Sequence, residues 1–252
     1  MKPSFSYFIF LYFAFVSSGS CQKAIDSNTG TLKITFHNTV NGEPMVLDGP
    51  TYTNPFGESY NITKFKYYIS NVSLGSPGNT AIEKDSYHLV DQNVPGSLSF
   101  SFETAENTFS DLRFLIGVDS VRNVSGAQAG ALDPLNDMFW TWNSGYVMAK
   151  MEGTSSSSNQ ARNIIEYHIG GFSGINNALK DIFLAIPSDQ PLVIKPGQTS
   201  EITIEVDFNK WWQTPNDIKI ANMPVCTTPG ILAKKVADNY SKMFTIMKVA
   251  NN

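Results

Sequence analysis

Apolar and polar side chains alternate, residue by residue, in about eight separate stretches of this chain of 252 residues. Alternation with a period of two indicates a strand with one buried face, because successive side chains of a strand point to opposite faces of the sheet. Clusters of Gly, Pro and Asn separate the stretches and are typical of turns. The pattern predicts an all-β protein, an antiparallel β-sandwich of barrel-like shape. The expected strands are Leu32–Phe36, Phe65–Val72, Tyr87–Asp91, Leu98–Phe102, Leu112–Val118, Ile164–Ile169, Ile182–Ile186 and Ile202–Phe208.

Two segments depart from this alternation. Gly117–Tyr146 combines two tryptophans with four glycines and predicts a long aromatic loop. That loop either covers one end of the sandwich or forms a redox or ligand environment. Ile231–Tyr240 contains no Gly or Pro and predicts a short helix near the C-terminus. Without a repeat or a linker in the sequence, residues 31–252 are expected to form one domain.

The first twenty residues indicate export. A short basic start precedes an almost unbroken apolar run over residues 5–16, which is too short to span a bilayer and suits a signal peptide. Four small residues follow and end at Cys21, as in a lipobox, although Ser18 stands where Leu is usual. We expect residues 1–20 to be a signal peptide, Cys21 to carry lipid and residues 21–30 to form a tether. The alternative is plain secretion, with Cys21 paired in a disulfide bond.

Composition and motifs exclude several classes of function. A net charge of -4 offers no basic surface for nucleic acid, and two cysteines exclude a disulfide scaffold and a multi-cysteine zinc site. The sequence holds no nucleophile elbow, phosphate loop, zinc-protease motif or dinucleotide motif. A carboxylate pair for glycoside hydrolysis could be drawn from several acids, but no spacing brings two of them together. We therefore do not expect an enzyme. The acids considered are Asp119, Asp133, Glu152 and Glu166.

The three histidines are the candidate metal ligands. His37 and His168 both lie on the polar side of their alternating strands, whereas the side that His88 takes is less clear. A single such histidine is usually an ordinary surface residue, but two on polar strand faces suggest a metal site. Imidazole suits copper, zinc and nickel, and copper binds with the highest intrinsic affinity.

Seven segments, read in order, resemble the MbnP-like copper-binding family. The resemblance extends from about Thr31 to Val249, and the tryptophan-containing block is its most specific part. The lipobox and the second histidine segment are similar to a branch found in Bacteroidetes-type bacteria, which implies the cell envelope of a Gram-negative bacterium, at the periplasm or the outer-membrane surface. The segments are FKYYISNVSL, YHLVD, FLIGVDSVRN, GALDPLNDMFWTWNSGY, EG, YHIGGF and VDF.

This resemblance implies a β-sandwich that holds copper through histidines, beside a tryptophan that some relatives oxidise to kynurenine. Relatives are often encoded next to a di-haem cytochrome c peroxidase-like partner. The resemblance gives His168 as a ligand, His37 as the second ligand and His88 as a weaker third, while Trp140 and Trp142 match the tryptophan pair beside the metal. In some relatives the modified tryptophan stands two residues before a ligand histidine, whereas here Glu166 precedes His168 at that distance.

The resulting hypothesis is an exported lipoprotein that binds one copper ion through His37 and His168. It requires their two strands to lie in one sheet or at a shared edge, because one ion needs both imidazoles close together. The alternative is a metal-free surface module whose aromatic loop binds a sugar or a partner protein.

Overall fold

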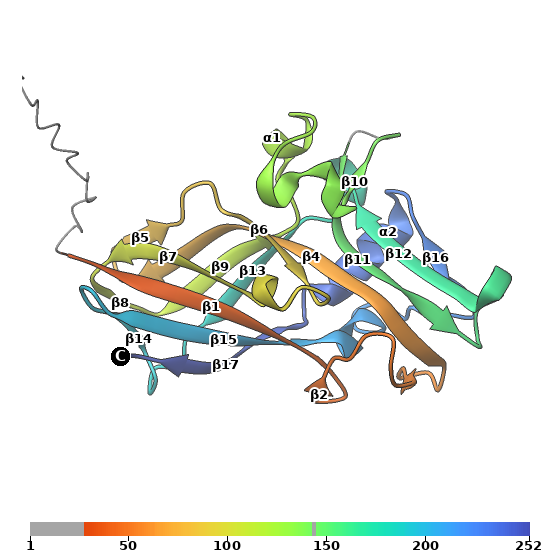
Figure 1. Cartoon of the computed structure of the whole chain (residues 1–252), viewed down its shortest axis with the longest axis horizontal. Coiled ribbons are helices and arrows are strands. Elements are labelled where there is room, and N and C mark those ends of the chain that lie inside the picture. The colour runs from red at the N-terminus through yellow and green to blue at the C-terminus, as the bar shows by residue number, and fades with distance from the viewer. Residues whose placement is uncertain (1–27, 143–144) are drawn as a thin grey trace, which may run out of the picture.

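The computed structural model describes residues 28–142 and 145–252 (Figure 1). Strands dominate the described chain, and two α-helices interrupt them: α1 (Ser120–Asn123) and α2 (Ile231–Tyr240). The strands are β1 (Thr29–Val40), β2 (Glu43–Pro44), β3 (Tyr52–Thr53), β4 (Ser59–Ser76), β5 (Asn79–Ile82), β6 (Tyr87–Asp91), β7 (Ser99–Ala105), β8 (Asn107–Phe109), β9 (Asp111–Ile116), β10 (Phe139–Trp140), β11 (Gly145–Ser155), β12 (Ile164–Gly170), β13 (Lys180–Ala185), β14 (Leu192–Ile194), β15 (Thr199–Asp207), β16 (Val225–Cys226) and β17 (Phe244–Ala250).

Two large sheets form the sandwich. The smaller sheet has the order β17–β15–β1–β2, and β7 also pairs with β1; β1 and β15 run parallel and the other pairs are antiparallel. The larger sheet has the order β13–β9–β4–β11–β12–β16, and β3, β5, β6 and β10 attach to its strands. Both sheets curl, which confirms the predicted all-β, barrel-like sandwich. Strand β4 runs along the larger sheet as one long band (Figure 1).

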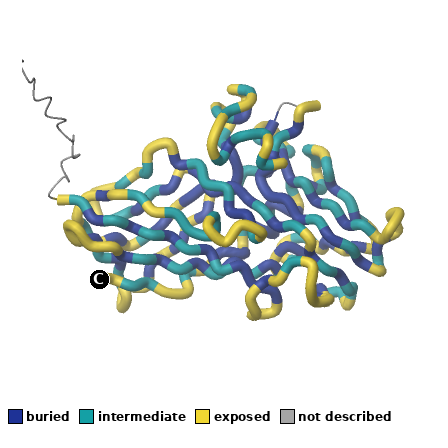
Figure 2. The backbone as a smooth tube through the Cα atoms, viewed as in Figure 1, coloured by how far each residue is buried: buried dark blue, intermediate teal, exposed yellow. Residues whose placement is uncertain are grey.

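The hydrophobic core fills the space between the two sheets, as the buried inner sides of the strands show (Figure 2). In β1, Leu32, Ile34 and Phe36 are buried and their neighbours in the sequence are partly exposed, as the alternation predicts. The ring of Phe36 packs edge-on against Tyr67 of β4, with the ring centroids 6.0 Å apart. This contact joins the inner faces of the two sheets. Because burial of such side chains drives folding, alternation was a reliable guide to these strands.

The sequence pattern did not predict β11, although this strand lies at the centre of the larger sheet, between β4 and β12. The cause is visible in its burial. Gly145–Met151 are buried without interruption, because the inner side faces the main core and the outer side lies under the aromatic loop. A strand buried on both faces has no alternation to detect.

The predicted aromatic loop covers the outer face of the larger sheet rather than an end of the sandwich. Its apolar side chains form a second, smaller cluster with Tyr68 of β4 and with the start of β11. Trp140 belongs to this cluster and lies against Gly170 of β12. A β-carbon built on Gly170 would stand 2.6 Å from Cη2 of Trp140, so only glycine leaves room for the indole here.

The C-terminal region contains the predicted helix, now seen as α2, followed by one further strand, β17. Helix α2 packs against β12, and its Tyr240 hydroxyl donates to the carbonyl of Ala178 at 2.8 Å. Strand β1 begins at Thr29, two residues before the expected start of the domain at Thr31.

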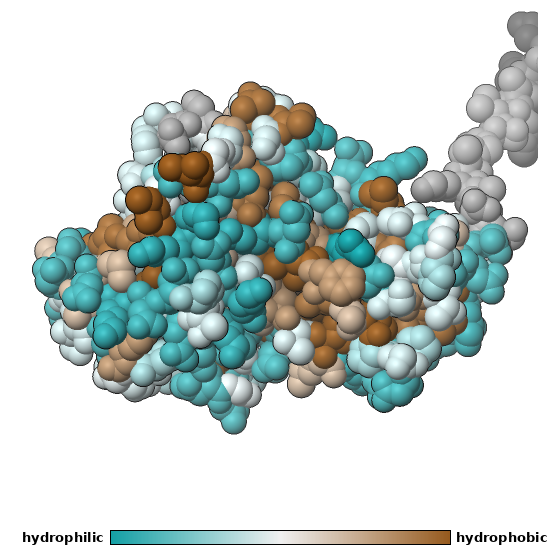
Figure 3. Space-filling model, turned by 180° about the vertical axis from the view of Figure 1, so that it is seen from behind, coloured by the Kyte–Doolittle hydropathy of each residue, from teal (hydrophilic) through white to brown (hydrophobic). Residues whose placement is uncertain are grey.

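Cys21 and the predicted signal peptide lie outside the described residues. Within those residues, no helix has both the length and the apolar character needed to cross a membrane. Seen from behind, hydrophobic residues lie in separate patches among hydrophilic ones (Figure 3).

We predict that Gly170→Ala displaces Trp140 and lowers the free energy of unfolding by about 1–3 kcal/mol, the usual cost of overpacking. Denaturant unfolding measures the loss, and quenching of tryptophan fluorescence reports the displaced indole. Gly96→Ala is the matched control, because no atom lies within 4 Å of a β-carbon built there. Equal stability and equal quenching for the two variants would contradict the proposed role of Gly170.

Candidate metal centre

Two rows of charged side chains cross the outer face of the larger sheet. Strand register places Lys66, Lys150 and His168 opposite one another on β4, β11 and β12. The adjacent row consists of Lys64, Glu152 and Glu166 on the same three strands. All six side chains point away from the main core, because the residues between them in each strand are buried in it.

Glu152 lies at the centre of this cluster. Its Oε1 atom is 2.8 Å from Nε2 of His168, and its Oε2 atom is 3.1 Å from the Lys64 ammonium. The same His168 nitrogen is 3.4 Å from Oε1 of Glu166. The hydrogen bond from His168, aided by Lys64 and Lys150 and opposed by burial, lowers the pKa of Glu152 to about 2. Glu152 is therefore ionised at any pH near neutrality.

Asp137 closes the cluster from above. Asp137 belongs to the aromatic loop and directly follows a short 3-10 turn over Pro134–Asn136. The backbone of Asp137 is left-handed, with φ 61°. Its Oδ2 atom lies 2.9 Å from both the Lys64 and the Lys150 ammonium groups. Lys150 also donates to the backbone carbonyl of Asp137. Burial alone would raise the pKa of Asp137, but the two lysines hold it below its ordinary value.

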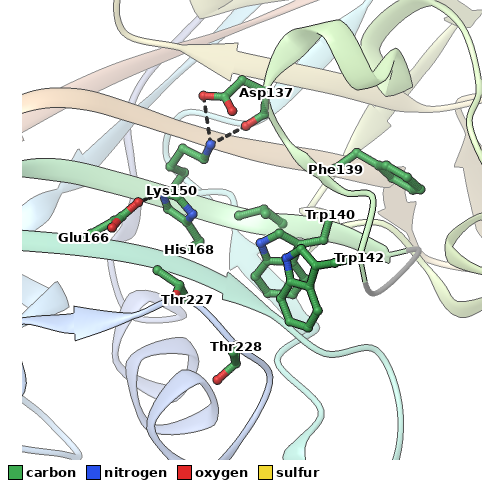
Figure 4. A pocket seen from close by; sticks show the side chains of 10 residues that line it. Asp137, Phe139, Trp140, Trp142, Lys150, Glu166, His168, Thr227 and Thr228 are labelled. Carbon is green, nitrogen blue, oxygen red and sulfur yellow. Dashed lines mark hydrogen bonds and ion pairs between the residues drawn. The ribbon is translucent and has the colours of Figure 1, made fainter.

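A pocket of about 610 Å³ opens beside these charged rows (Figure 4). Its lining combines Lys150, Glu166 and His168 with the two indoles of the aromatic loop, Trp140 and Trp142. The indole rings lie side by side, 5.5 Å apart between centroids and tilted by 41°. Trp140 is buried, whereas Trp142 is 63% exposed at the rim. Beyond these residues, the lining contains Asp137, Phe139, Val147, Thr227 and Thr228.

The donor atoms of this cluster suit a metal ion. Glu152, Glu166 and His168 each offer one ligand atom, and these three atoms lie within 4.8 Å of one another. An imidazole nitrogen with carboxylate oxygens is a donor set that divalent copper, zinc or manganese accepts. Among the residues that the structure describes, this is the one group of three such side chains with that geometry.

The expectation that His37 and His168 lie in one sheet or at a shared edge is wrong. His37 is on β1 of the smaller sheet and His168 on β12 of the larger sheet, each on the side away from the core. Sheets in a sandwich pack about 10 Å apart, so side chains on opposite outer faces cannot both bond one ion at about 2 Å. His37 instead lines a separate pocket with Met247 and Lys248.

His88 lies in a third place, on β6. Its Nε2 atom is 2.9 Å from Oε1 of Glu83, and its ring stacks on Phe100 with the centroids 3.5 Å apart. These contacts hold the imidazole between two strands. The structure therefore brings together His168 and the tryptophan pair, and it leaves the other two histidines elsewhere.

The two remaining acids considered from the sequence, Asp119 and Asp133, cap helical turns. Asp119 caps α1 and accepts a hydrogen bond from the Tyr87 hydroxyl, and Asp133 caps the 3-10 turn that precedes Asp137. Cys226 is a free, buried thiol, and burial raises its pKa to about 11, which leaves it unreactive near neutral pH.

Lys64 and Lys150 were not identified from the sequence as site residues. The expected strand Phe65–Val72 begins one residue after Lys64. An extension by that residue puts Lys64 and Lys66 on the same face of the strand. The matching pair Lys150 and Glu152 is equally two residues apart. Lys150 and Glu152 lie on the same face only if this segment is a strand. The sequence does not reveal that strand, because Gly145–Met151 show no alternation of burial.

Comparison with known proteins supports the architecture. A family model described as MbnP matches residues 29–228 of the chain. Among solved structures, MbnP from Methylosinus trichosporium superimposes with a TM-score of 0.58 over 88% of this chain and 99% of that chain, at 12% sequence identity. At that identity the likeness concerns the fold. No curated protein sequence matched the chain. Because the matched residues cover well over half of the sequence and include both sheets, the chain belongs to the MbnP family.

Proposed function

We propose that this protein is an exported copper-binding protein that holds copper at the outer face of the larger sheet through His168. The observation that carries the proposal is the cluster itself. Three ligand atoms, from Glu152, Glu166 and His168, lie within 4.8 Å of one another beside a pocket lined by Trp140 and Trp142. Copper is the cargo of this site, taken up and passed on.

The choice of copper depends on the donor set and on the family. Copper(II) binds imidazole and carboxylate donors more tightly than other divalent ions of its row. Glu152 is ionised near neutral pH and needs no deprotonation before it binds. The resemblance of the sequence to copper-binding relatives points to the same metal, as does membership of the MbnP family.

A binding role is favoured over a catalytic one. A general acid must carry a proton near neutral pH, and a general base must have a pKa near the working pH. Glu152, with its pKa of about 2, meets neither condition. The cluster therefore fits ligand binding better than acid–base catalysis by Glu152. Together with the lack of a catalytic motif in the sequence, this supports our proposal that the protein is not an enzyme.

We predict that His168→Asn weakens copper binding by more than about ten-fold, because loss of even a supporting partner of a metal ligand costs that much. A competition titration on protein purified without a histidine tag measures the change. His37→Asn is the matched control, since His37 lies on the opposite outer face. Copper binding that survives His168→Asn but fails in His37→Asn would refute this site. Binding should also weaken in acid, because protons compete with copper for the imidazole.

The two indoles are the proposed sites of oxidation by a di-haem cytochrome c peroxidase-like partner. Trp142 is 63% exposed at the rim, and its ring lies against the buried Trp140, so an oxidant at the surface reaches Trp142 first. We predict that co-expression with such a partner yields a kynurenine at Trp142, detected by fragmentation of its peptide in mass spectrometry. Trp142→Phe is expected to abolish the modification. Two unmodified tryptophans after co-expression would contradict the proposed partnership.

The proposed location is the envelope of a Gram-negative bacterium, with lipid on Cys21 as the anchor. Strand β1 begins at Thr29, which leaves a short segment between the anchor and the folded part. We predict that Cys21→Ser releases the protein from membranes and leaves its thermal unfolding unchanged, because a lipid anchor contributes nothing to the core between the sheets. Fractionation of cells and a melting curve test both parts. Loss of folding would instead indicate that Cys21 pairs with Cys226.

A metal-free binding module is the second candidate function. It is favoured by one observation: Trp142 exposes most of its indole at the rim of a pocket with mixed polar and aromatic walls. Such a surface can stack on a sugar ring or on a partner's side chain. Absence of stoichiometric copper binding in the parent protein, together with glycan binding that depends on Trp142, would favour this function.

A further inference from the structure

Two lysines form ion pairs with carboxylates of the cluster, as a metal ion bound there would. Lys64 bridges Oε2 of Glu152 at 3.1 Å and Oδ2 of Asp137 at 2.9 Å. Lys150 reaches the same Asp137 oxygen at 2.9 Å and lies 3.8 Å from Oε1 of Glu152. The ammonium groups therefore already neutralise Glu152, which contacts His168, and Asp137.

Two lysines are unexpected in a site that binds divalent cations, because their positive charges repel such ions. Without them, Asp137, Glu152 and Glu166 would offer three anionic groups beside one imidazole. Such an oxygen-rich site suits ions that are held mainly by charge, such as manganese and calcium. With both lysines present, a divalent ion experiences repulsion from two positive charges within the same cluster, and only Lys64 is appreciably exposed to screening by solvent.

Copper differs from those ions in how it is held. It stands at the top of the affinity order for nitrogen and oxygen ligands, whereas manganese stands at the bottom. A strong bond to the imidazole of His168 can offset repulsion from the lysines, and an ion held mainly by charge has no comparable gain. The repulsion lowers the affinity for both ions by a similar factor, because both carry two charges. Copper starts from a much higher affinity and stays bound, whereas manganese is no longer held.

From this arrangement we infer that Lys64 and Lys150 determine the metal specificity of the site by excluding divalent cations that bind mainly through charge. The inference rests on the proposed copper function, because it concerns the same cluster. The two lysines act as specificity-determining residues and not as ligands. Their exclusion depends on a fixed positive charge and on its position next to Glu152.

Lys64 is the residue to change. It is one-third exposed, whereas Lys150 is almost fully buried and donates to the Asp137 carbonyl, so that its removal leaves a buried backbone group unpaired. The matched control is Lys66. It lies on the same strand and the same face, and its ammonium pairs with Asp91 at 2.9 Å and donates to the Asn136 carbonyl at 3.2 Å, with no ion pair to Glu152 or Asp137. A melting curve of Lys66→Met shows whether the loss of these two contacts disturbs the fold.

The experiment titrates the purified chain, without a histidine tag, with Mn²⁺ and with Cu²⁺. Loss of the free Mn²⁺ signal in electron paramagnetic resonance measures manganese binding, and a competition titration measures copper. We expect Lys64→Met to bind Mn²⁺ at least about ten-fold more tightly than the parent, because one repelling charge is removed. The affinity for Cu²⁺ should rise by a similar factor from a much higher starting value, because both ions carry two charges. Lys66→Met and Lys64→Arg, which keeps the charge, should both behave like the parent.

Unchanged Mn²⁺ affinity in Lys64→Met would overturn the inference, as would an equal gain in Lys66→Met. Lys64→Gln provides the same test with a polar side chain, if a melting curve shows that Met at this position disturbs the fold. Copper binding by the parent protein tests the proposed function, and manganese binding by Lys64→Met tests this inference. A parent that binds no copper contradicts the copper function, while a gain of Mn²⁺ binding in Lys64→Met supports exclusion by the lysine independently of that result.

Discussion

The burial of β11 on both faces is the constraint on which the rest of the site depends. Its inner side chains, including Met151, complete the main core between the sheets. Its outer side, near Tyr146 and Met148, packs under the aromatic loop. The loop cannot leave without exposing this second apolar cluster, so its position over the sheet is fixed by hydrophobic burial. That position in turn places Trp140 beside β12 and Asp137 above the lysines.

The alternating strands could be predicted because burial of one face leaves a pattern in the sequence. All eight expected strands are present, with β6 at the expected bounds, and α2 confirms the helix inferred from a stretch without Gly or Pro. Strands β11 and β17 were missed for different reasons. The first is buried on both faces. In the second, Ile246 pairs with Ile204 and Lys248 with Thr203, so the extra residue Met247 interrupts the alternation. Local pattern carries no information where both faces have the same environment.

The site itself was predictable only in part. Alternation placed His37 and His168 correctly on outward faces, but it could not tell which sheet each strand joins. That depends on long-range pairing, here the parallel pairing of β1 with β15. A histidine on an outward face is informative once its neighbours across the sheet are known. For His168 those neighbours are Lys150 and, one row away, Glu152, both from the strand that the pattern concealed.

The aromatic loop and the charged rows form one arrangement. A lysine as buried as Lys150 is costly unless its charge is paired. The loop that buries it also supplies the pairing, since Asp137 gives both a carboxylate oxygen and a backbone carbonyl to the ammonium group. The left-handed backbone at Asp137 directs both oxygens toward the sheet, and the same turn leads into Phe139 and Trp140. The segment that neutralises the lysines is therefore also the segment that carries the tryptophans, so one packed loop positions both the charges and the indoles.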